Sequence, residues 1–333
     1  MGEADYPADL SALSAYDLKA WEEIRRWENK PARRKVLPVS ARLALSRAGE
    51  SAAEAWKSVP GASQVDQVVE QVLSGGNQAV TDAVTASLRR ARIIDAVRAS
   101  GHPVSDLADL QHLDLELLDS VCPSLNLRYA AASAATGAGA GFVAGGGTAA
   151  IVGTAGVGAA PGGLAVGSAL IGDVVATIAL AARVVAHYAG YYGFDARTEE
   201  EKAVILAIIG VGVAGEGAAK QAAMLHVRQV AMMVARRAAW KELSEEAIVV
   251  LLQAMFAKLA VNLTKAKLAM VLPVAGIAIG GSFNYALMRK VGTAASYLYR
   301  ERFLIEKYGL DSAVATTDGS SIIGAAEIGS VSE

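Results

Sequence analysis

Apolar residues recur at every third or fourth position along most of this chain, which is the spacing of one face of an α-helix. The pattern begins in residues 14–30. Its apolar positions there are Leu18, Trp21, Ile24 and Trp27. Ser14, followed three residues later by Asp17, is similar to a capping box, and Pro31 is placed to end the helix. The first predicted element is therefore an amphipathic helix that carries two tryptophans.

The helical periodicity continues to about residue 308, and no stretch alternates apolar and polar residues with a period of two. Acidic and leucine-rich residues at 102–121 predict short helices that pack on a neighbour. The longer predicted helical segments are 39–56, 64–99 with a break at 74–76, 164–192, 199–237, 243–269 and 274–308. The sequence therefore predicts an all-α fold, a multi-helix bundle.

Two long runs carry no charged residue, Tyr129–Gly172 and Leu268–Met288. The first is rich in glycine and alanine, and Pro161-Gly162-Gly163 is a turn signal between two helices. Small residues four positions apart share a helix face and let another backbone approach closely. The glycines expected to pack helices are Gly137, Gly141, Gly145, Gly163, Gly167, Gly276 and Gly280. We therefore expect a Gly/Ala-rich helical hairpin in the core of the bundle.

The composition of the first uncharged run bears on whether it crosses a membrane. Glycine and alanine contribute little to insertion, and the larger apolar residues of the run supply about -4 kcal/mol over two crossings. One buried aspartate, such as Asp173 in the continuation of the second helix, costs roughly +3 kcal/mol. A buried hairpin in a soluble or membrane-attached protein is therefore the favoured interpretation, and insertion into the bilayer is the alternative.

Composition divides the chain into three parts. Residues 1–125 form an N-terminal helical region with basic and acidic segments, and residues 126–308 form the Gly/Ala-rich helical core continuous with it. Residues 309–333 are a small, polar tail. The N-terminus begins acidic and lacks the apolar segment of a secretory signal. We therefore expect a cytoplasmic protein that associates peripherally with the membrane.

The chain shows no motif that specifies a reaction. Gly210-x-Gly212-x-x-Gly215 has the form of a dinucleotide-binding fingerprint, but no second strand follows it, so we interpret these glycines as helix-packing residues. The four histidines lack metal-ligand spacing, and the single cysteine, Cys122, lacks a catalytic signature. The 31 basic and 33 acidic residues nearly balance, which argues against a nucleic-acid-binding protein. We expect no catalytic residue, no cofactor and no metal.

Three polar residues are candidates for burial in the helix that follows the glycine-rich block: Asp173, Arg183 and His187. Asp173 and His187 fall on one helix face. An unpaired carboxylate at Asp173 would be costly after so long an uncharged run, so we expect it to meet a cation such as Arg183 or Lys202. A structural ion pair is the simpler interpretation, and a site that contacts a ligand is the alternative.

Basic residues gather between positions 25 and 47, where Glu28 is the one acidic residue. With Trp21 and Trp27 beside them, these charges suit an anionic membrane surface, where each basic residue contributes about 1 kcal/mol. The residues assigned to membrane or lipid contact are Trp21, Arg25, Arg26, Trp27, Lys30, Arg33, Arg34 and Lys35. The alternative is a solvated cationic face that pairs with the acidic 102–119 segment.

Four passages together give the chain a resemblance to the EcsC family over about residues 14–308. They are YDLKAWEEIRRWENKP at 16–31, GAGAGFVAGGGT at 137–148, GDVVATIALAARVVAHYAGYYGFD at 172–195, and KLAMVLPVAGIAIGGSFNYALMRKVGTAASYLYRERFL at 267–304. The resemblance implies a mostly helical, non-catalytic protein of bacterial type. The family takes its name from a gene that accompanies the ATPase and membrane subunits of an ABC exporter. The glycine-rich core is also loosely similar to the senescence domain of spartin-like lipid-droplet proteins.

Two functions are expected from these patterns. The first is a non-enzymatic, amphitropic protein that binds lipid or membrane through its small-residue-packed apolar core and its basic N-terminal face. The alternative is a soluble helical scaffold that regulates an ABC exporter or a secretion system. An anionic lipid surface is the expected partner in the first case, transporter or secretion components are expected in the second, and nucleic acid is expected in neither.

Overall fold

The computed structural model describes seven stretches of the chain. They are residues 10–30, 80–85, 90–137, 164–214, 217–235, 245–268 and 276–310. Within them, only the backbone is described for residues 134–137, 164–173, 245–246, 264–268 and 276–283. The regular elements in these stretches are all helical, which confirms the all-α prediction for the described residues.

The first long helix, α1 (Ala15–Glu28), begins as its sequence predicts. The side-chain oxygen of Ser14 accepts a hydrogen bond of 3.1 Å from the backbone N–H of Asp17, so one of the unpaired donors at the helix start is satisfied. The helix ends at Asn29, whose N–H donates to the carbonyl of Arg25. Trp21 and Ile24 are buried on its inner face.

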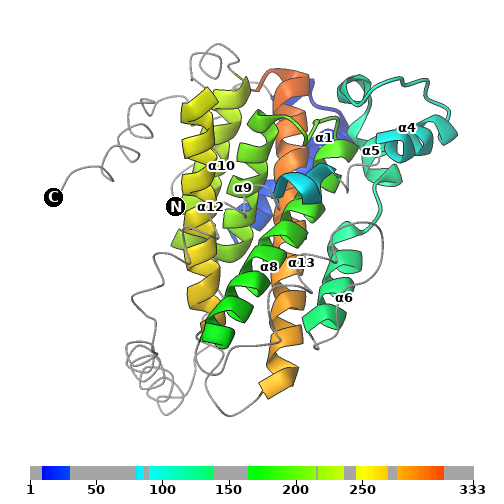
Figure 1. Cartoon of the computed structure of the whole chain (residues 1–333). Coiled ribbons are helices and arrows are strands. Elements are labelled where there is room, and N and C mark those ends of the chain that lie inside the picture. The colour runs from blue at the N-terminus through cyan, green and yellow to red at the C-terminus, as the bar shows by residue number, and fades with distance from the viewer. Residues whose placement is uncertain are drawn as a thin grey trace.

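The body of the bundle consists of long helices lying side by side (Figure 1). They are α8 (Leu164–Tyr191), α9 (Glu199–Ala214), α10 (Ala218–Ala235), α12 (Glu245–Leu268) and α13 (Gly276–Tyr308). Helix α9 lies at the centre, in contact with α8, α10, α12 and α13. After its charged first turn, α9 is buried on nearly all sides, as expected for a helix segment that is apolar around its whole circumference.

Helix α13 also contacts α6 (Leu125–Gly137), and glycines allow the close approach of these helices. A Cβ atom added at Gly212 of α9 would lie 2.9 Å from the Cα atom of Val291 in α13. A Cβ atom added at Gly292 would lie 2.8 Å from the Cα atom of Asn126 in α6. The interpretation of Gly212 as a packing glycine is therefore confirmed, and Gly292 has the same role without belonging to the predicted set.

The predicted helix at 199–237 is wrong in one respect, because the structure divides it into α9 and α10. Gly217 lies between them with a φ of +73°, a backbone conformation that glycine adopts without the steric cost other residues pay. Periodicity does not reveal the division, since both helices are apolar enough to continue the pattern. The predicted helices at 164–192, 243–269 and 274–308 agree with α8, α12 and α13 to within two residues at each end.

Smaller N-terminal elements cover one end of the long helices. They are a 3-10 turn (Leu10–Ala12), α4 (Arg90–Ala99), a 3-10 helix (Ala108–His112) and α5 (Leu115–Val121). Ile24, Leu110 and Leu118 belong to the same buried hydrophobic cluster as Phe303. The described part of the N-terminal region therefore shares one hydrophobic core with the long helices. The predicted helix at 39–56, residues 64–79 and the tail beyond residue 310 lie outside the described residues.

One described helix is long and apolar enough to cross a membrane by length and composition alone. It is the window Val174–Tyr191 of α8, with a mean hydropathy of 1.4, and 61% of the window is buried inside the protein. A core helix of a soluble protein has the same properties, so this feature by itself is weak evidence for a membrane span.

Candidate functional site

The end of α13 that carries its charged residues holds a buried ion-pair network with α1 and α10. Glu301 is 3% exposed and lies between two guanidinium groups, those of Arg25 and Arg228. Nη2 of Arg228 lies 2.8 Å from Glu301, and Nη1 of the same residue lies 2.7 Å from Glu28. Arg25 also pairs with Glu28 at 2.5 Å. Two arginines and two glutamates therefore join three helices.

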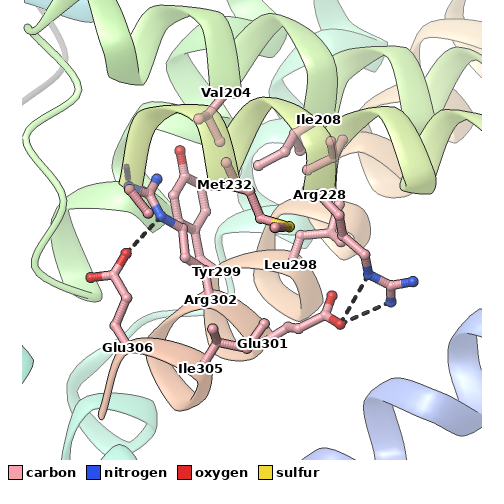
Figure 2. A pocket seen from close by; sticks show the side chains of 13 residues that line it. Val204, Ile208, Arg228, Met232, Leu298, Tyr299, Glu301, Arg302, Ile305 and Glu306 are labelled. Carbon is pink, nitrogen blue, oxygen red and sulfur yellow. Dashed lines mark hydrogen bonds and ion pairs between the residues drawn. The ribbon is translucent and has the colours of Figure 1, made fainter. Parts of the chain in front are cut away.

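A small pocket lies beside this network, between α9, α10 and α13 (Figure 2). Its volume is about 70 Å³, which is room for a few water molecules. Its polar walls are already occupied: Arg228 pairs with Glu301, and Arg302 pairs with Glu306 at 3.0 Å (Figure 2). Because the pocket is small and these charged groups are paired, we interpret it as a packing defect beside the ion-pair network rather than a ligand site.

Glu201 of α9 forms further polar contacts with α13 beside this network. The hydroxyl of Tyr299 donates a hydrogen bond of 2.5 Å to Glu201, and Nη1 of Arg302 lies 2.7 Å from the same carboxylate. The guanidinium carbon of Arg302 also lies 4.0 Å from the centroid of the Phe194 ring. Burial alone would lower the pKa of Arg302, but the carboxylates around it raise that pKa above its ordinary value. Arg302 therefore stays charged.

The acidic N-terminal segment pairs with the same end of α13. Asp119 accepts hydrogen bonds from the hydroxyls of Tyr16 (2.8 Å) and Tyr192 (2.7 Å), and Arg300 lies 2.9 Å from it. Lys307 lies 3.1 Å from Asp114. The alternative prediction paired the acidic 102–119 segment with the basic N-terminal residues, but among the described residues Asp114 and Asp119 find their cations on α13.

The residues predicted to contact lipid are divided by the structure. Trp21 is 4% exposed, and Arg25 belongs to the Glu301 network. The Trp27 ring stacks on the Tyr297 ring at a centroid distance of 4.9 Å, and Nζ of Lys220 lies 3.7 Å from the centroid of the Trp27 ring. Contact of Trp21 with lipid would require α1 to leave the bundle, and Arg25 and Trp27 are half-buried and engaged with α10 and α13. The exposed members are Arg26 and Lys30, whereas Arg33, Arg34 and Lys35 lie outside the described residues.

A second polar cluster lies between α6 and α8, where the sequence singles out Arg183 and His187. Nδ1 of His187 lies 2.8 Å from the hydroxyl oxygen of Tyr129, and the two rings meet edge to face. Burial raises the pKa of Tyr129 to about 12, although the nearby positive charge of Arg183 opposes the increase. Tyr129 therefore stays protonated at neutral pH. The side chain of Asp173 lies outside the described residues, and Lys202 pairs with Glu199 at 2.5 Å.

Sequence reasoning missed Tyr129 because its partner is 58 positions away, on another helix. It also missed Glu28, Arg228 and Glu301, whose pairings span as many as 276 positions. The sequence does contain a signal for Glu301. The triplet Arg300-Glu301-Arg302 interrupts an otherwise apolar and aromatic stretch of a long helix. Charges in such a setting are expected to be paired.

Helix ends that belong to or border the two uncharged runs lie at one end of the bundle. The C-terminal ends of α6 and α12 and the N-terminal ends of α8 and α13 all lie at the lower end in Figure 1. Four of the predicted packing glycines fall on these helix ends: Gly137, Gly167, Gly276 and Gly280. Gly141, Gly145 and Gly163 lie outside the described residues, and the packing role of all seven stays a prediction. The ion-pair networks lie at the opposite end of α13.

Two observations on the described residues concern metal-ligand and thiol chemistry. These residues contain no group of three or more His, Cys, Asp and Glu side chains that could hold a metal ion. Burial raises the pKa of the Cys122 thiol to about 12, so Cys122 is almost entirely protonated at neutral pH and is a poor nucleophile. The charged side chains of the α13 networks are held by one another.

Comparison with known proteins gives one match. Residues 146–304 match the family model described as the EcsC protein family. The match covers α8, α9, α10 and α12 in full, and most of α13. No curated protein and no solved structure shows significant similarity to the chain.

Proposed function

We propose that this chain, which belongs to the EcsC protein family, is a non-enzymatic protein that attaches reversibly to membranes through the uncharged end of its bundle. One observation carries the proposal. The helix ends of α6, α8, α12 and α13 that meet at the lower end in Figure 1 belong to, or border, the uncharged runs Tyr129–Gly172 and Leu268–Met288. The charged networks lie at the other end of α13.

This separation of charge suits a protein that meets lipid with one end. The small-residue ends of α6, α8 and α13 carry no charged residue, so they carry little desolvation cost when they enter the interfacial region of a bilayer. The last turn of α12 carries Lys265 and Lys267, whose charges can stay at the level of the lipid headgroups. The charged end would remain in water, where its ion pairs tie the helices together. Arg26 is exposed on α1, Lys30 is exposed just beyond its end, and Arg33, Arg34 and Lys35 follow in sequence, which supports a contribution from anionic lipid.

Cell fractionation tests the attachment directly. Membranes from cells that make the full-length chain are washed with high salt and then with alkaline carbonate. Attachment predicts recovery in the membrane fraction. Release by salt would show that electrostatic attraction holds the protein on the membrane. Resistance to both washes would show that the uncharged end inserts into the bilayer. A protein found wholly in the soluble fraction, and unable to float with anionic vesicles, would refute the proposal.

Matched double variants locate the attachment. Phe142→Asp with Ile151→Asp places two carboxylates in the first uncharged run and should reduce vesicle binding at least about tenfold, because each charge is costly to move toward hydrocarbon. Ala91→Asp with Ala99→Asp adds the same charge on exposed positions of α4 and should leave binding near its original value. Equal effects of the two pairs would argue against an attachment through the uncharged end.

A second function, that of a soluble scaffold for an ABC exporter or secretion apparatus, is favoured by the outer face of α12. Val249, Val250 and Val261 of this helix are 43%, 53% and 39% exposed. Exposed apolar side chains on one face of a helix suit contact with a protein partner. This function predicts a monodisperse protein without detergent and without co-purifying lipid. Stoichiometric lipid in native mass spectra would count against it.

A further inference from the structure

One arginine of the bundle is unlike the others. The half-buried arginines in the described part of the chain are Arg25, Arg90, Arg183, Arg228, Arg300 and Arg302. Five of them lie within 4 Å of at least one carboxylate. Arg183, on α8, has no carboxylate partner among the described residues. A half-buried guanidinium group is normally paired, because its partial desolvation is otherwise uncompensated.

The surroundings of Arg183 are basic and aromatic. His187 lies one turn further along the same face of α8, and its ring is held by the Tyr129 hydroxyl at 2.8 Å. Arg128 precedes Tyr129 on α6, is exposed, and pairs with no carboxylate in the described stretches. The positive charge of Arg128 opposes the rise that burial causes in the pKa of Tyr191, a residue of α8 one turn beyond His187. The face shared by α6 and α8 therefore carries an oriented histidine, with Arg183 one turn before it on α8 and the charge of Arg128 acting one turn after it.

We infer that this face is a binding site for a phosphate group, with the guanidinium of Arg183 as its anchor and His187 and Arg128 as further basic contacts. The planar guanidinium fork donates two parallel hydrogen bonds to the oxygens of a phosphate. A phosphate monoester carries between one and two negative charges near pH 7. This charge matches two arginines that have no carboxylate partner in the described part of the chain better than the single charge of a carboxylate does. Tyr129 acts as a positioning residue, because it reaches the ligand only through His187.

The phosphate can come from a lipid headgroup or from a soluble metabolite, and the chemistry of recognition is the same. For the headgroup source, the inference rests on the proposed membrane attachment. Arg128 is the last charged residue before the first uncharged run, so α6 joins the basic face directly to the end of the bundle assigned to lipid. The experiment therefore has one arm with vesicles and one arm without them.

In the vesicle arm, phosphatidylcholine vesicles contain 20 mol% of either phosphatidic acid or oleic acid, so that a phosphate monoester is compared with a carboxylate. The full-length protein should bind the phosphatidic acid vesicles at least about tenfold more tightly. Arg183→Gln should remove this preference, and Arg183→Lys should retain part of it, because lysine keeps the charge without the fork. Arg92→Gln, which removes an exposed arginine of α4, should keep the preference.

In the soluble arm, glycerol 3-phosphate is titrated into the same four proteins without lipid. If the wild type floats with neither vesicle but binds glycerol 3-phosphate, and Arg183→Gln abolishes this binding, membrane attachment fails while the phosphate site stands. If the wild type binds both vesicles equally and binds no glycerol 3-phosphate, attachment stands and the site is refuted. The site is also refuted if Arg183→Gln shows the thermal unfolding transition of a folded protein and binds vesicles and glycerol 3-phosphate as the wild type does.

Discussion

Glu301 of α13 and Arg228 of α10 form an ion pair of 2.8 Å in which the carboxylate is 3% exposed. The pair is shared, because Arg25 contacts Glu301 from α1 and Arg228 continues to Glu28. Each charge therefore has at least one opposite charge beside it, and removing one member leaves the others partly uncompensated in a desolvated setting.

Glu301→Gln should therefore lower the free energy of unfolding by about 3 kcal/mol, since it leaves two guanidinium groups facing a neutral amide. Equilibrium unfolding in urea measures the change. Glu306→Gln is the matched control on the same helix, because Glu306 is exposed and pairs with Arg302 near the surface, a setting worth about 0–1 kcal/mol. Equal losses from both variants would contradict the central role of Glu301.

Acid should weaken the same network through Glu28. Burial alone would raise the pKa of Glu28, but the hydrogen bond and charge of Arg228, with the charges of Arg25 and Lys220, lower it below the ordinary value. A carboxylate with a lowered pKa in the folded state stabilises the protein fully above its unfolded pKa, and this contribution disappears as pH falls through the folded pKa.

The free energy of unfolding should therefore fall as the pH is lowered below about 4.3, the ordinary pKa of a glutamate. The measurement is a series of urea titrations between neutral pH and the acid limit of solubility. Glu28→Gln should be less stable at neutral pH, and its stability should decline less steeply with acid. If the free energy of unfolding of Glu28→Gln fell with pH as steeply as that of the wild type, other titrating groups would determine the acid dependence.

Two glycines of α9 should respond to alanine in opposite ways. At Gly212 a new Cβ atom would lie 2.9 Å from the backbone of Val291, so Gly212→Ala should destabilise the fold by about 1–3 kcal/mol. At Gly210 the nearest atom is the Cδ2 atom of Leu259 at 3.8 Å, an ordinary contact, so Gly210→Ala should stabilise α9 by about 0.5–1 kcal/mol. Thermal unfolding of the two variants checks the sign at each position.

The single cysteine provides a probe of packing around α5. With its pKa raised to about 12, the Cys122 thiol should react with an aromatic disulfide reagent at pH 8 at least about a hundredfold more slowly than in the unfolded chain, where its pKa is about 8.5. Absorbance of the released thiolate gives the rate, with and without urea. Comparable rates in the two states would show that the segment opens readily.

Much of the fold could be predicted from local patterns. The bounds of α8, α12 and α13 follow from uninterrupted helical periodicity, and the start of α1 follows from Ser14 and Asp17, whose interaction spans three residues. The division between α9 and α10 was missed, because it depends on one backbone conformation at Gly217 that leaves no trace in hydrophobic spacing.

The candidate site was less predictable because its contacts are long-range. The basic residues between positions 25 and 47, with Trp21 and Trp27 beside them, have the composition of an exposed membrane face. Trp21 is nevertheless buried, and Arg25 pairs with a glutamate 276 positions away. No local pattern identifies such a partner. His187 and Arg183 were singled out by their position after the uncharged run, and both are half-buried in the structure, whereas Tyr129, which holds His187, could be found only in three dimensions.

The hydrogen bond between Tyr308 and Asp17, 2.5 Å long, connects the first described long helix to the last residue of the last one. A ribosome synthesises the chain from its N-terminus, so α1 emerges well before α13, which supplies its ring stacking and most of its ion pairs. During that interval the apolar face of α1, with Trp21 and Trp27, has no permanent cover. The nascent chain therefore exposes an apolar helix face that the finished protein covers, and chaperones can bind this face before α13 has been synthesised.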